Sequence, residues 1–202
     1  MKQKNQTKII ILEGVTTTGK SSVFYNLQRY AKEHNLNWIF VPETETTIPI
    51  IDSIDPKKNN NHLEKLLKRA LGQKADLYVF DRLHFSSIFK TNAKTEDLKE
   101  VEEILSEFDA QIFMLYVPVI SLRERIKESM KYRNVEWTEY LLNKVGGDKE
   151  KVADIYVNRQ ELVMQLMKKS LLKINIVDTS DQNFVRVTRQ IIDELKLKPN
   201  LN

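Results

Sequence analysis

Residues 8–27, KIIILEGVTTTGKSSVFYNL, join an apolar run, a glycine-containing turn and an amphipathic segment without a gap. The run Ile9–Leu12 is continuously apolar and rich in β-branched residues, which predicts a buried strand. Apolar residues at helical spacing then predict a helix with one buried face: Val23, Phe24, Leu27 and Ala31. The turn between strand and helix, residues 14–21, reads GVTTTGKS and matches G-x-x-x-x-G-K-S/T. Because the pattern lies in this context, it predicts a phosphate-binding P-loop.

The P-loop predicts a site for Mg²⁺ with ATP. Backbone N–H groups of such a loop and of the following helix N-terminus point at the phosphates. We expect Lys20 to neutralise the β- and γ-oxygens, and the Ser21 hydroxyl to be a ligand of Mg²⁺. The expected cofactor-binding residues are Gly14, Val15, Thr16, Thr17, Thr18, Gly19, Lys20, Ser21 and Ser22.

The rest of the chain predicts an α/β fold. Five apolar runs are expected strands: Lys8–Leu12, Asn37–Val41, Leu77–Phe80, Gln111–Val117 and Lys173–Val177. Helical patterns separate these runs, so the sheet is expected to be parallel and doubly wound, with helices on both faces. Ser121 and Glu124 have the spacing of a capping box and predict the start of a helix. Residues 44–61 are expected to form a long loop, and residues 1–202 a single domain.

Composition excludes several classes of protein. The chain has no cysteine, which excludes a disulfide framework and thiolate zinc sites and fits a cytoplasmic protein. The net charge is +4, but the basic residues are scattered, so they are expected to be solvated and to bind no nucleic acid. No apolar run is long enough for a signal peptide or a membrane span, so we expect no membrane partner.

Acidic and basic residues follow two of the expected strands. Asp81 and Arg82 follow the third apolar run, where a P-loop protein places a carboxylate near the metal. Asp81 would otherwise cap a turn, and Arg82 would grip a phosphate or form a salt bridge. Glu43 ends the second run and is compatible with a general base for a hydroxyl acceptor, or with a solvated loop residue.

Two further sets of residues have both a functional and a structural interpretation. Arg125 and Arg133 lie in a basic segment and would stabilise transferred phosphoryl charge from a mobile flap, or simply face solvent. Phe85 and Phe89 would stack on a base or join the core. The three histidines, at positions 34, 62 and 84, have no carboxylate partner that the sequence identifies and are expected to be structural.

These motifs resemble those of the thymidylate kinases and the related deoxynucleoside kinases, over nearly the whole chain. Glu13-Gly14 is similar to the opening of that family's P-loop, and Asp81-Arg82 with Ser86-Ser87 looks like its Asp-Arg-x-x-x-Ser-Ser signature. The resemblance implies the sheet order 2-3-1-4-5, a basic lid at about residues 121–147, a phosphate contact for Arg82 and a possible homodimer. Thr16 departs from the pattern, because thymidylate kinases usually carry an acid there. Val41-Pro42-Glu43 is closer to the deoxynucleoside kinases.

The sequence therefore predicts an ATP-dependent phosphotransferase. The favoured acceptor is a nucleoside monophosphate similar to dTMP, bound by Glu43, Arg82 and Phe85. The expected catalytic residues are Lys20, Glu43, Asp81, Arg82, Arg125 and Arg133. One alternative is a deoxynucleoside kinase in which Glu43 deprotonates a 5′-hydroxyl. A second is an ATP-binding protein without small-molecule kinase activity, and the diffuse charge does not favour a polynucleotide kinase.

Overall fold

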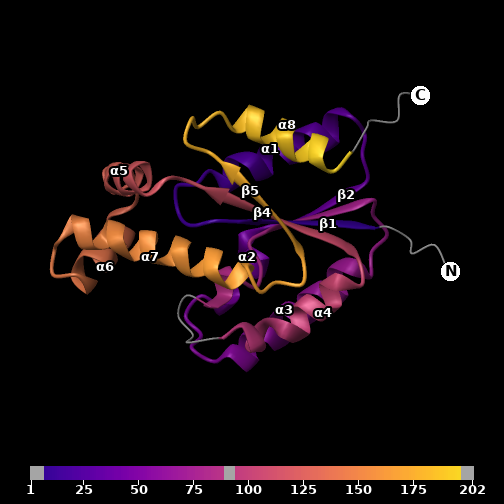
Figure 1. The fold of residues 1–202 in the computed structure, drawn as a ribbon, viewed down its shortest axis with the longest axis horizontal. Coiled ribbons are helices and arrows are strands. Elements are labelled where there is room, and N and C mark those ends of the chain that lie inside the picture. Colours follow the sequence, from indigo (N-terminus) through magenta and orange to yellow (C-terminus); the bar gives the residue numbers. More distant parts are fainter. Residues whose placement is uncertain (1–6, 89–93, 197–202) are drawn as a thin grey trace.

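The computed structural model describes residues 7–88 and 94–196, which form a five-stranded parallel sheet with helices on both faces (Figure 1). The strand order is β2-β3-β1-β4-β5, as the resemblance to the thymidylate kinases implies. The strands are β1 (Lys8–Glu13), β2 (Trp38–Val41), β3 (Leu77–Asp81), β4 (Asp109–Tyr116) and β5 (Lys173–Asp178). All five expected strands are thus confirmed, with bounds that move by one or two residues.

Two hydrophobic cores sandwich the sheet. One face is covered by α1 (Lys20–Glu33) and α8 (Phe184–Glu194), and the other by α3 (Pro56–Leu71), α4 (Lys99–Ser106) and α7 (Lys149–Met167). Strand side chains alternate between the faces, so Ile10 and Leu12 pack toward α1 while Ile9 and Ile11 pack toward α3. Burial on both faces explains why the middle of β1, Ile9–Leu12, is continuously apolar rather than alternating.

A third core holds the segment between β4 and β5. It joins α5 (Val119–Ser129), α6 (Val135–Lys144) and the first half of α7, and it includes Val15 of the P-loop. These three helices form the projection at the left of Figure 1. The expected lid is therefore helical and packs on the P-loop. The helix after Pro118 begins at Val119, two residues before Ser121, so the expected capping box does not start it.

Residues 44–61 are not the long loop that we expected. They contain most of α2 (Glu43–Thr46), a 3₁₀ turn at Ile48–Ile50 and the start of α3. Asp55 caps α3 by accepting a hydrogen bond from Lys57 N at 2.9 Å. The Asn run that suggested a loop is partly buried instead, because Asn59 donates a hydrogen bond to the carbonyl of Ser87 at 3.1 Å.

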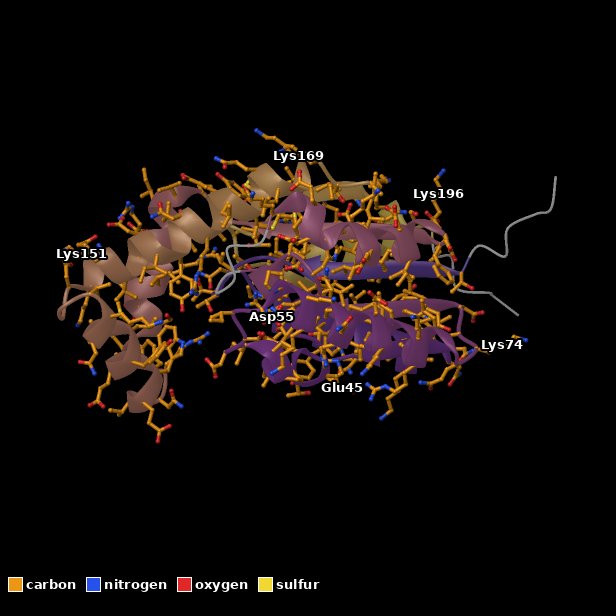
Figure 2. All side chains as sticks on the ribbon, turned by 90° about the horizontal axis from the view of Figure 1, so that it is seen from below. Glu45, Asp55, Lys74, Lys151, Lys169 and Lys196 are labelled. Carbon is orange, nitrogen blue, oxygen red and sulfur yellow. The ribbon has the colours of Figure 1, made fainter. Side chains whose placement is uncertain are left out.

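Charged side chains are distributed around the described surface. Figure 2 shows Lys74, Lys151, Lys169 and Lys196 at separate edges of the molecule, so these four do not form one basic patch. Within residues 7–88 and 94–196, no helix is both long and apolar enough to span a membrane.

The sheet register places the site. Leu12 lies beside Asp81, and Glu13 beside Met114. The P-loop that follows β1 therefore lies next to the turn that follows β3, at the carboxyl edge of the sheet.

Candidate active site

A cavity of about 610 Å³ opens at this carboxyl edge. Its floor is the P-loop, and two walls rise from different parts of the chain. The first wall, after β2 and β3, contains Glu43, Thr47, Ile48, Ile50, Ile51, Arg82, Ser86 and Ser87. The second, from the segment between β4 and β5 and from the start of α8 with the loop before it, contains Arg133, Trp137, Tyr156, Arg159, Gln182 and Phe184. The fold thus brings residues from both halves of the chain to one P-loop.

Seven of the nine expected P-loop residues line the cavity: Val15, Thr16, Thr17, Gly19, Lys20, Ser21 and Ser22. Thr18 is fully buried and donates a hydrogen bond to the carbonyl of Val15 at 2.9 Å, so it supports the loop from behind. Gly14 also lies outside the cavity lining. These two residues shape the loop rather than face a ligand.

Both P-loop glycines are required by close contacts and by backbone conformation. A Cβ atom at Gly14 would lie 2.7 Å from the carbonyl oxygen of Leu115, and one at Gly19 would lie 1.9 Å from the ring of Phe184. The φ angles are +145° at Gly14 and +92° at Gly19, values that side chains disfavour. Phe184 therefore packs directly on the backbone where α1 begins.

Lys20 lines the floor of the cavity and is largely buried there. Its side chain donates a hydrogen bond from Nζ to the carbonyl of Val15 at 2.9 Å. Burial and the nearby Arg82 lower the pKa of Lys20 to about 7, although Asp81 favours the charged form. Burial also raises the pKa of Asp81, against the effect of Lys20. The two groups form a buried pair whose charges depend on each other.

Arg82 bridges the P-loop and the first wall. Its Nη1 donates hydrogen bonds of 2.9 Å to the carbonyl of Gly14 and to the hydroxyl of Ser86. Its Nε lies 2.8 Å from Oε1 of Glu43, an ion pair in which Nε makes no geometrically acceptable hydrogen bond among the described residues. Glu43, at the start of α2, reaches the cavity with a side chain that is 34% exposed. The structure thus contains the salt bridge that we considered for Arg82, at the rim of the cavity.

Two arginines on the second wall are held against aromatic rings. The guanidinium carbon of Arg133 lies 4.4 Å from the centroid of Trp137, and that of Arg159 lies 5.3 Å from the centroid of Tyr156. Burial raises the pKa of Tyr156, while Arg159 and a hydrogen bond with Thr16 oppose the rise. Tyr156 thus connects α7 to the P-loop.

Sequence reasoning missed Trp137, Tyr156 and Arg159 as site residues. In the sequence, Tyr156 and Arg159 lie at helical spacing with apolar residues such as Val152 and Val163, and so resemble core positions of a long helix. Arg159 itself could have indicated the site, because a charged side chain among apolar residues must reach a polar partner or solvent. Trp137 lies in a helix that we did not separate from the lid.

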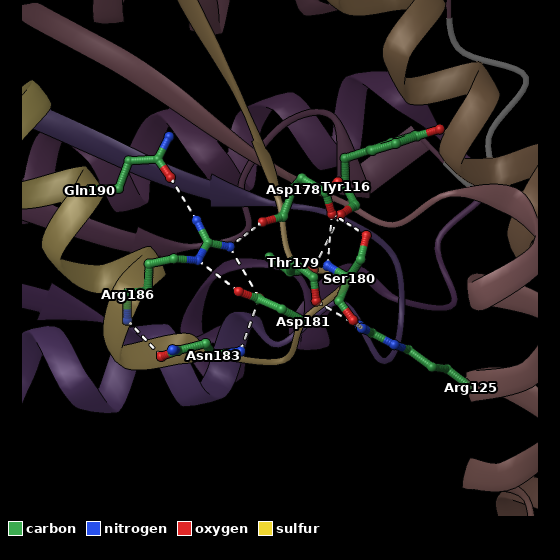
Figure 3. Close-up of polar contacts among 9 residues, drawn as sticks. All are labelled: Tyr116, Arg125, Asp178, Thr179, Ser180, Asp181, Asn183, Arg186 and Gln190. Atoms are coloured by element: carbon green, nitrogen blue, oxygen red, sulfur yellow. Dashed lines mark hydrogen bonds and ion pairs between the residues drawn. The ribbon is translucent and has the colours of Figure 1, made fainter.

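Arg125 does not line the cavity, contrary to the expectation that it would face the transferred phosphoryl group. Its Nη2 donates hydrogen bonds of 2.7 Å to the carbonyls of Thr179 and Ser180 (Figure 3). Its Nη1 donates a hydrogen bond of 3.4 Å to the carbonyl of Thr17. Burial lowers the pKa of Arg125, and Asp178 opposes this effect. Arg125 therefore ties the lid to the loop after β5 and to the P-loop.

The expectation that Phe85 binds the acceptor is also wrong. Its side chain is 1% exposed and belongs to the core between the sheet and α3, so it does not stack on a base in the cavity. Phe89 lies outside the described residues. His84 has the carboxylate partner that the sequence did not identify, because its Nε2 lies 3.2 Å from Oε1 of buried Glu102.

The residues at the start of α1 and the end of β3 fit a magnesium ion that arrives with a nucleotide. Mg²⁺ binds oxygen ligands and usually keeps several waters. Ser21 lines the cavity, and Oδ1 of Asp81 is buried without a hydrogen-bond partner among the described residues. Across residues 7–88 and 94–196, no group of three or more His, Cys, Asp or Glu side chains is placed to hold a metal ion without other ligands. Phosphate oxygens would complete the ligand set.

Comparison with protein families found no matching model, and comparison with curated proteins found no matching sequence. Solved structures do match. The YorR protein of Bacillus subtilis, solved in complex with phosphorylated GDP, is 20% identical, with a TM-score of 0.61 over 94% of this chain and 96% of that one. Thymidylate kinase from Ehrlichia chaffeensis is 15% identical, with a TM-score of 0.53 over 95% of this chain and 100% of that one. Polyphosphate kinase 2 from Arthrobacter aurescens TC1 is 14% identical, with a TM-score of 0.58 over 98% of this chain and 71% of that one. The expected likeness to thymidylate kinases is therefore confirmed at the level of the fold.

Proposed function

We propose that this chain transfers the γ-phosphoryl group of Mg-ATP to a small acceptor, with a nucleoside monophosphate similar to dTMP as the favoured acceptor. One observation carries the proposal. Among the described residues, four basic side chains and one carboxylate line the cavity at the P-loop: Lys20, Arg82, Arg133 and Arg159 against Glu43. This excess of positive charge suits a triphosphate together with a second phosphorylated ligand. The YorR complex with phosphorylated GDP supports a nucleotide as one of these ligands.

Each part of the cavity has a role in this reaction. The P-loop backbone would hold the phosphates, and Lys20 would stabilise charge on the β- and γ-oxygens. Ser21 and Asp81 would hold Mg²⁺, which supplies charge neutralisation at those oxygens. Arg133 and Arg159, oriented by their aromatic neighbours, would stabilise the equatorial oxygens of the transferred group. Catalysis would rest on positioning and on preorganised charge.

The acceptor determines what Glu43 does. A monophosphate has a second pKa near 6, so its attacking oxygen is already ionised at neutral pH and needs no base. A hydroxyl acceptor must lose a proton during attack. The carboxylate of Glu43 at the cavity favours this second candidate, a deoxynucleoside kinase in which Glu43 is the general base.

Phosphoryl transfer is tested by ADP release from Mg-ATP in the presence of individual deoxynucleosides, their monophosphates or no acceptor. We expect turnover with at least one monophosphate, and a loss of about 10²-fold or more in Lys20→Ala, because the γ-phosphoryl charge loses a stabilising cation. No turnover with any acceptor would overturn the proposal and leave an ATP-binding protein. Full activity in Lys20→Ala would refute the role of the P-loop.

Glu43→Gln separates the two acceptors, since it keeps the shape of the side chain and removes the base. A monophosphate kinase should keep its kcat within about tenfold, whereas a nucleoside kinase should lose about 10²-fold or more. A loss of 10²-fold or more in kcat with a monophosphate acceptor would contradict the assignment of an ionised acceptor that needs no base.

A further inference from the structure

Glu13, the last residue of β1, is a fully buried carboxylate that follows the apolar residues Ile9–Leu12. Its Oε1 accepts hydrogen bonds from the backbone N–H of Leu83 at 3.0 Å and of Ser86 at 3.4 Å. Its Oε2 accepts the hydroxyl of Ser86 at 2.5 Å. All three donors belong to the turn after β3. A buried carboxylate is stable only when such donors surround it, so Glu13 and this turn depend on each other.

The hydroxyl of Ser86 links Glu13 to Arg82. The oxygen that donates its proton to Glu13 accepts a hydrogen bond from Nη1 of Arg82 at 2.9 Å, and Nη1 also contacts the carbonyl of Gly14. A continuous series of hydrogen bonds therefore runs from the end of β1 through Ser86 and Arg82 back to the first residue of the P-loop.

Arg82 needs this support because its backbone is strained. Its φ angle is +62°, in the left-handed region that residues with a Cβ atom disfavour. The backbone N–H of Arg82 bonds to the carbonyl of Leu12 at 3.0 Å, and Glu13 binds the next N–H, that of Leu83. Consecutive residues of β1 thus hold the turn that directs the Arg82 side chain to the cavity. Strained conformations persist where surrounding contacts over-determine them.

We propose that Glu13 is a positioning residue that fixes the guanidinium of Arg82 through Ser86, and so sets the affinity of the site for its acceptor. This inference rests on the proposed function for its kinetic consequence. Glu13 would not touch the acceptor, because it is fully buried and does not line the cavity, whereas Arg82 and Ser86 do. The Glu13 carboxylate thus links β1, the strand that leads into the P-loop, to Arg82 at the cavity.

Two variants disrupt the series at different points. Glu13→Gln keeps an oxygen for the Leu83 N–H but places an NH₂ donor where Oε2 accepts the Ser86 hydroxyl. Ser86→Ala removes the link while leaving Glu13 in place. We expect both variants to raise the KM for the acceptor about tenfold or more. Binding of an Mg-bound, non-hydrolysable ATP analogue in the absence of acceptor should change less than about threefold.

A matched control is available elsewhere in the chain. The hydroxyl of Ser170 donates a 2.5 Å hydrogen bond to Glu102, another buried carboxylate, and Ser170 does not line the cavity. Ser170→Ala therefore removes the same kind of bond and should leave the acceptor KM unchanged. An equal rise in KM in Ser170→Ala would overturn the proposal.

A double-mutant cycle with Arg82→Ala distinguishes positioning from a general effect on folding. If Glu13 acts through Arg82, Glu13→Gln should change the acceptor kcat/KM less than about twofold in the Arg82→Ala background. If Glu13→Gln lowers the acceptor kcat/KM by the same factor in the Arg82→Ala background as in the wild type, Glu13 acts independently of Arg82 and the inference is refuted.

The positioning role has a second readout that does not depend on turnover. Rotation of the Arg82 guanidinium, followed by NMR of its Nη nuclei, should be restricted in the wild type and in Ser170→Ala, and faster in Glu13→Gln and Ser86→Ala. An inactive wild type with this pattern would refute only the proposed function. Identical Arg82 rotation in all four proteins would refute the positioning role.

Discussion

Binding of a nucleotide should draw a proton onto Lys20. In the ligand-free protein, burial and Arg82 lower its pKa to about 7, so at pH 8 only about one lysine in ten would be an ammonium. Phosphate oxygens near Nζ favour the ammonium form. If the bound state restores an ordinary pKa of about 10.4, the complex takes up about 0.9 proton at pH 8 and about 0.5 at pH 7.

Linkage sets the sign of the pH dependence. Because the complex holds more protons than the free protein, affinity should decrease as the pH rises above about 7, approaching a tenfold loss per pH unit. Below pH 6 the free lysine is already charged, and its contribution should no longer vary with pH. The terminal phosphate, with a pKa near 6, is almost fully ionised at pH 8 and adds little to the uptake there.

Isothermal titration calorimetry measures this uptake directly. An Mg-bound, non-hydrolysable ATP analogue is titrated at pH 8 in two buffers of different ionisation enthalpy, and the difference in heat gives the number of protons. Lys20→Met removes the group and should abolish the uptake. An uptake below about 0.2 proton in the wild type, or equal uptake in both proteins, would refute the assignment, since the expected value follows from the lowered pKa.

Three further predictions follow from single contacts. Gly19→Ala should lower the free energy of urea unfolding by about 2–5 kcal/mol, through the positive φ and the overlap with Phe184. Gly72→Ala, where φ is −69°, should cost less than about 1.5 kcal/mol, and equal losses would contradict this account. Arg133→Ala should lower kcat by about 10²-fold or more, because it removes a charge that stabilises the transferred phosphoryl group. The unfolding free energy should change by less than about 1 kcal/mol. An unchanged kcat would show that Arg133 takes no part in catalysis. Burial raises the pKa of Glu102, but hydrogen bonds to the carboxylate outweigh this and leave the pKa lowered. The Glu102 carboxylate therefore stabilises the fold at pH values above its pKa in the unfolded chain, and this stabilisation is lost as the pH falls through its pKa in the folded protein. When the unfolding free energy is measured between pH 6 and 3, Glu102→Gln should lose less stability than the wild type.

The predictions that held were local in sequence. The strand, turn and helix at residues 8–27 were readable because burial on both faces requires a continuous apolar run and a P-loop requires its glycines at fixed places. The sheet order came from the resemblance rather than from periodicity. The expected loop at 44–61 was wrong because buried asparagines, which pair with backbone groups elsewhere in the chain, look like loop residues in sequence.

The sequence by itself determined the strands and helices of a parallel α/β fold and a P-loop between the first strand and helix, because apolar runs, helical periodicity and the P-loop motif are all readable in short stretches of sequence. The tertiary structure alone decided which charged side chains reach the cavity. Arg125 and Arg133 lie in the same basic segment, yet Arg125 binds the carbonyls of Thr179 and Ser180 while Arg133 lines the cavity. The direction of a long side chain depends on which distant backbone groups lie within its reach, and folding alone brings those groups together.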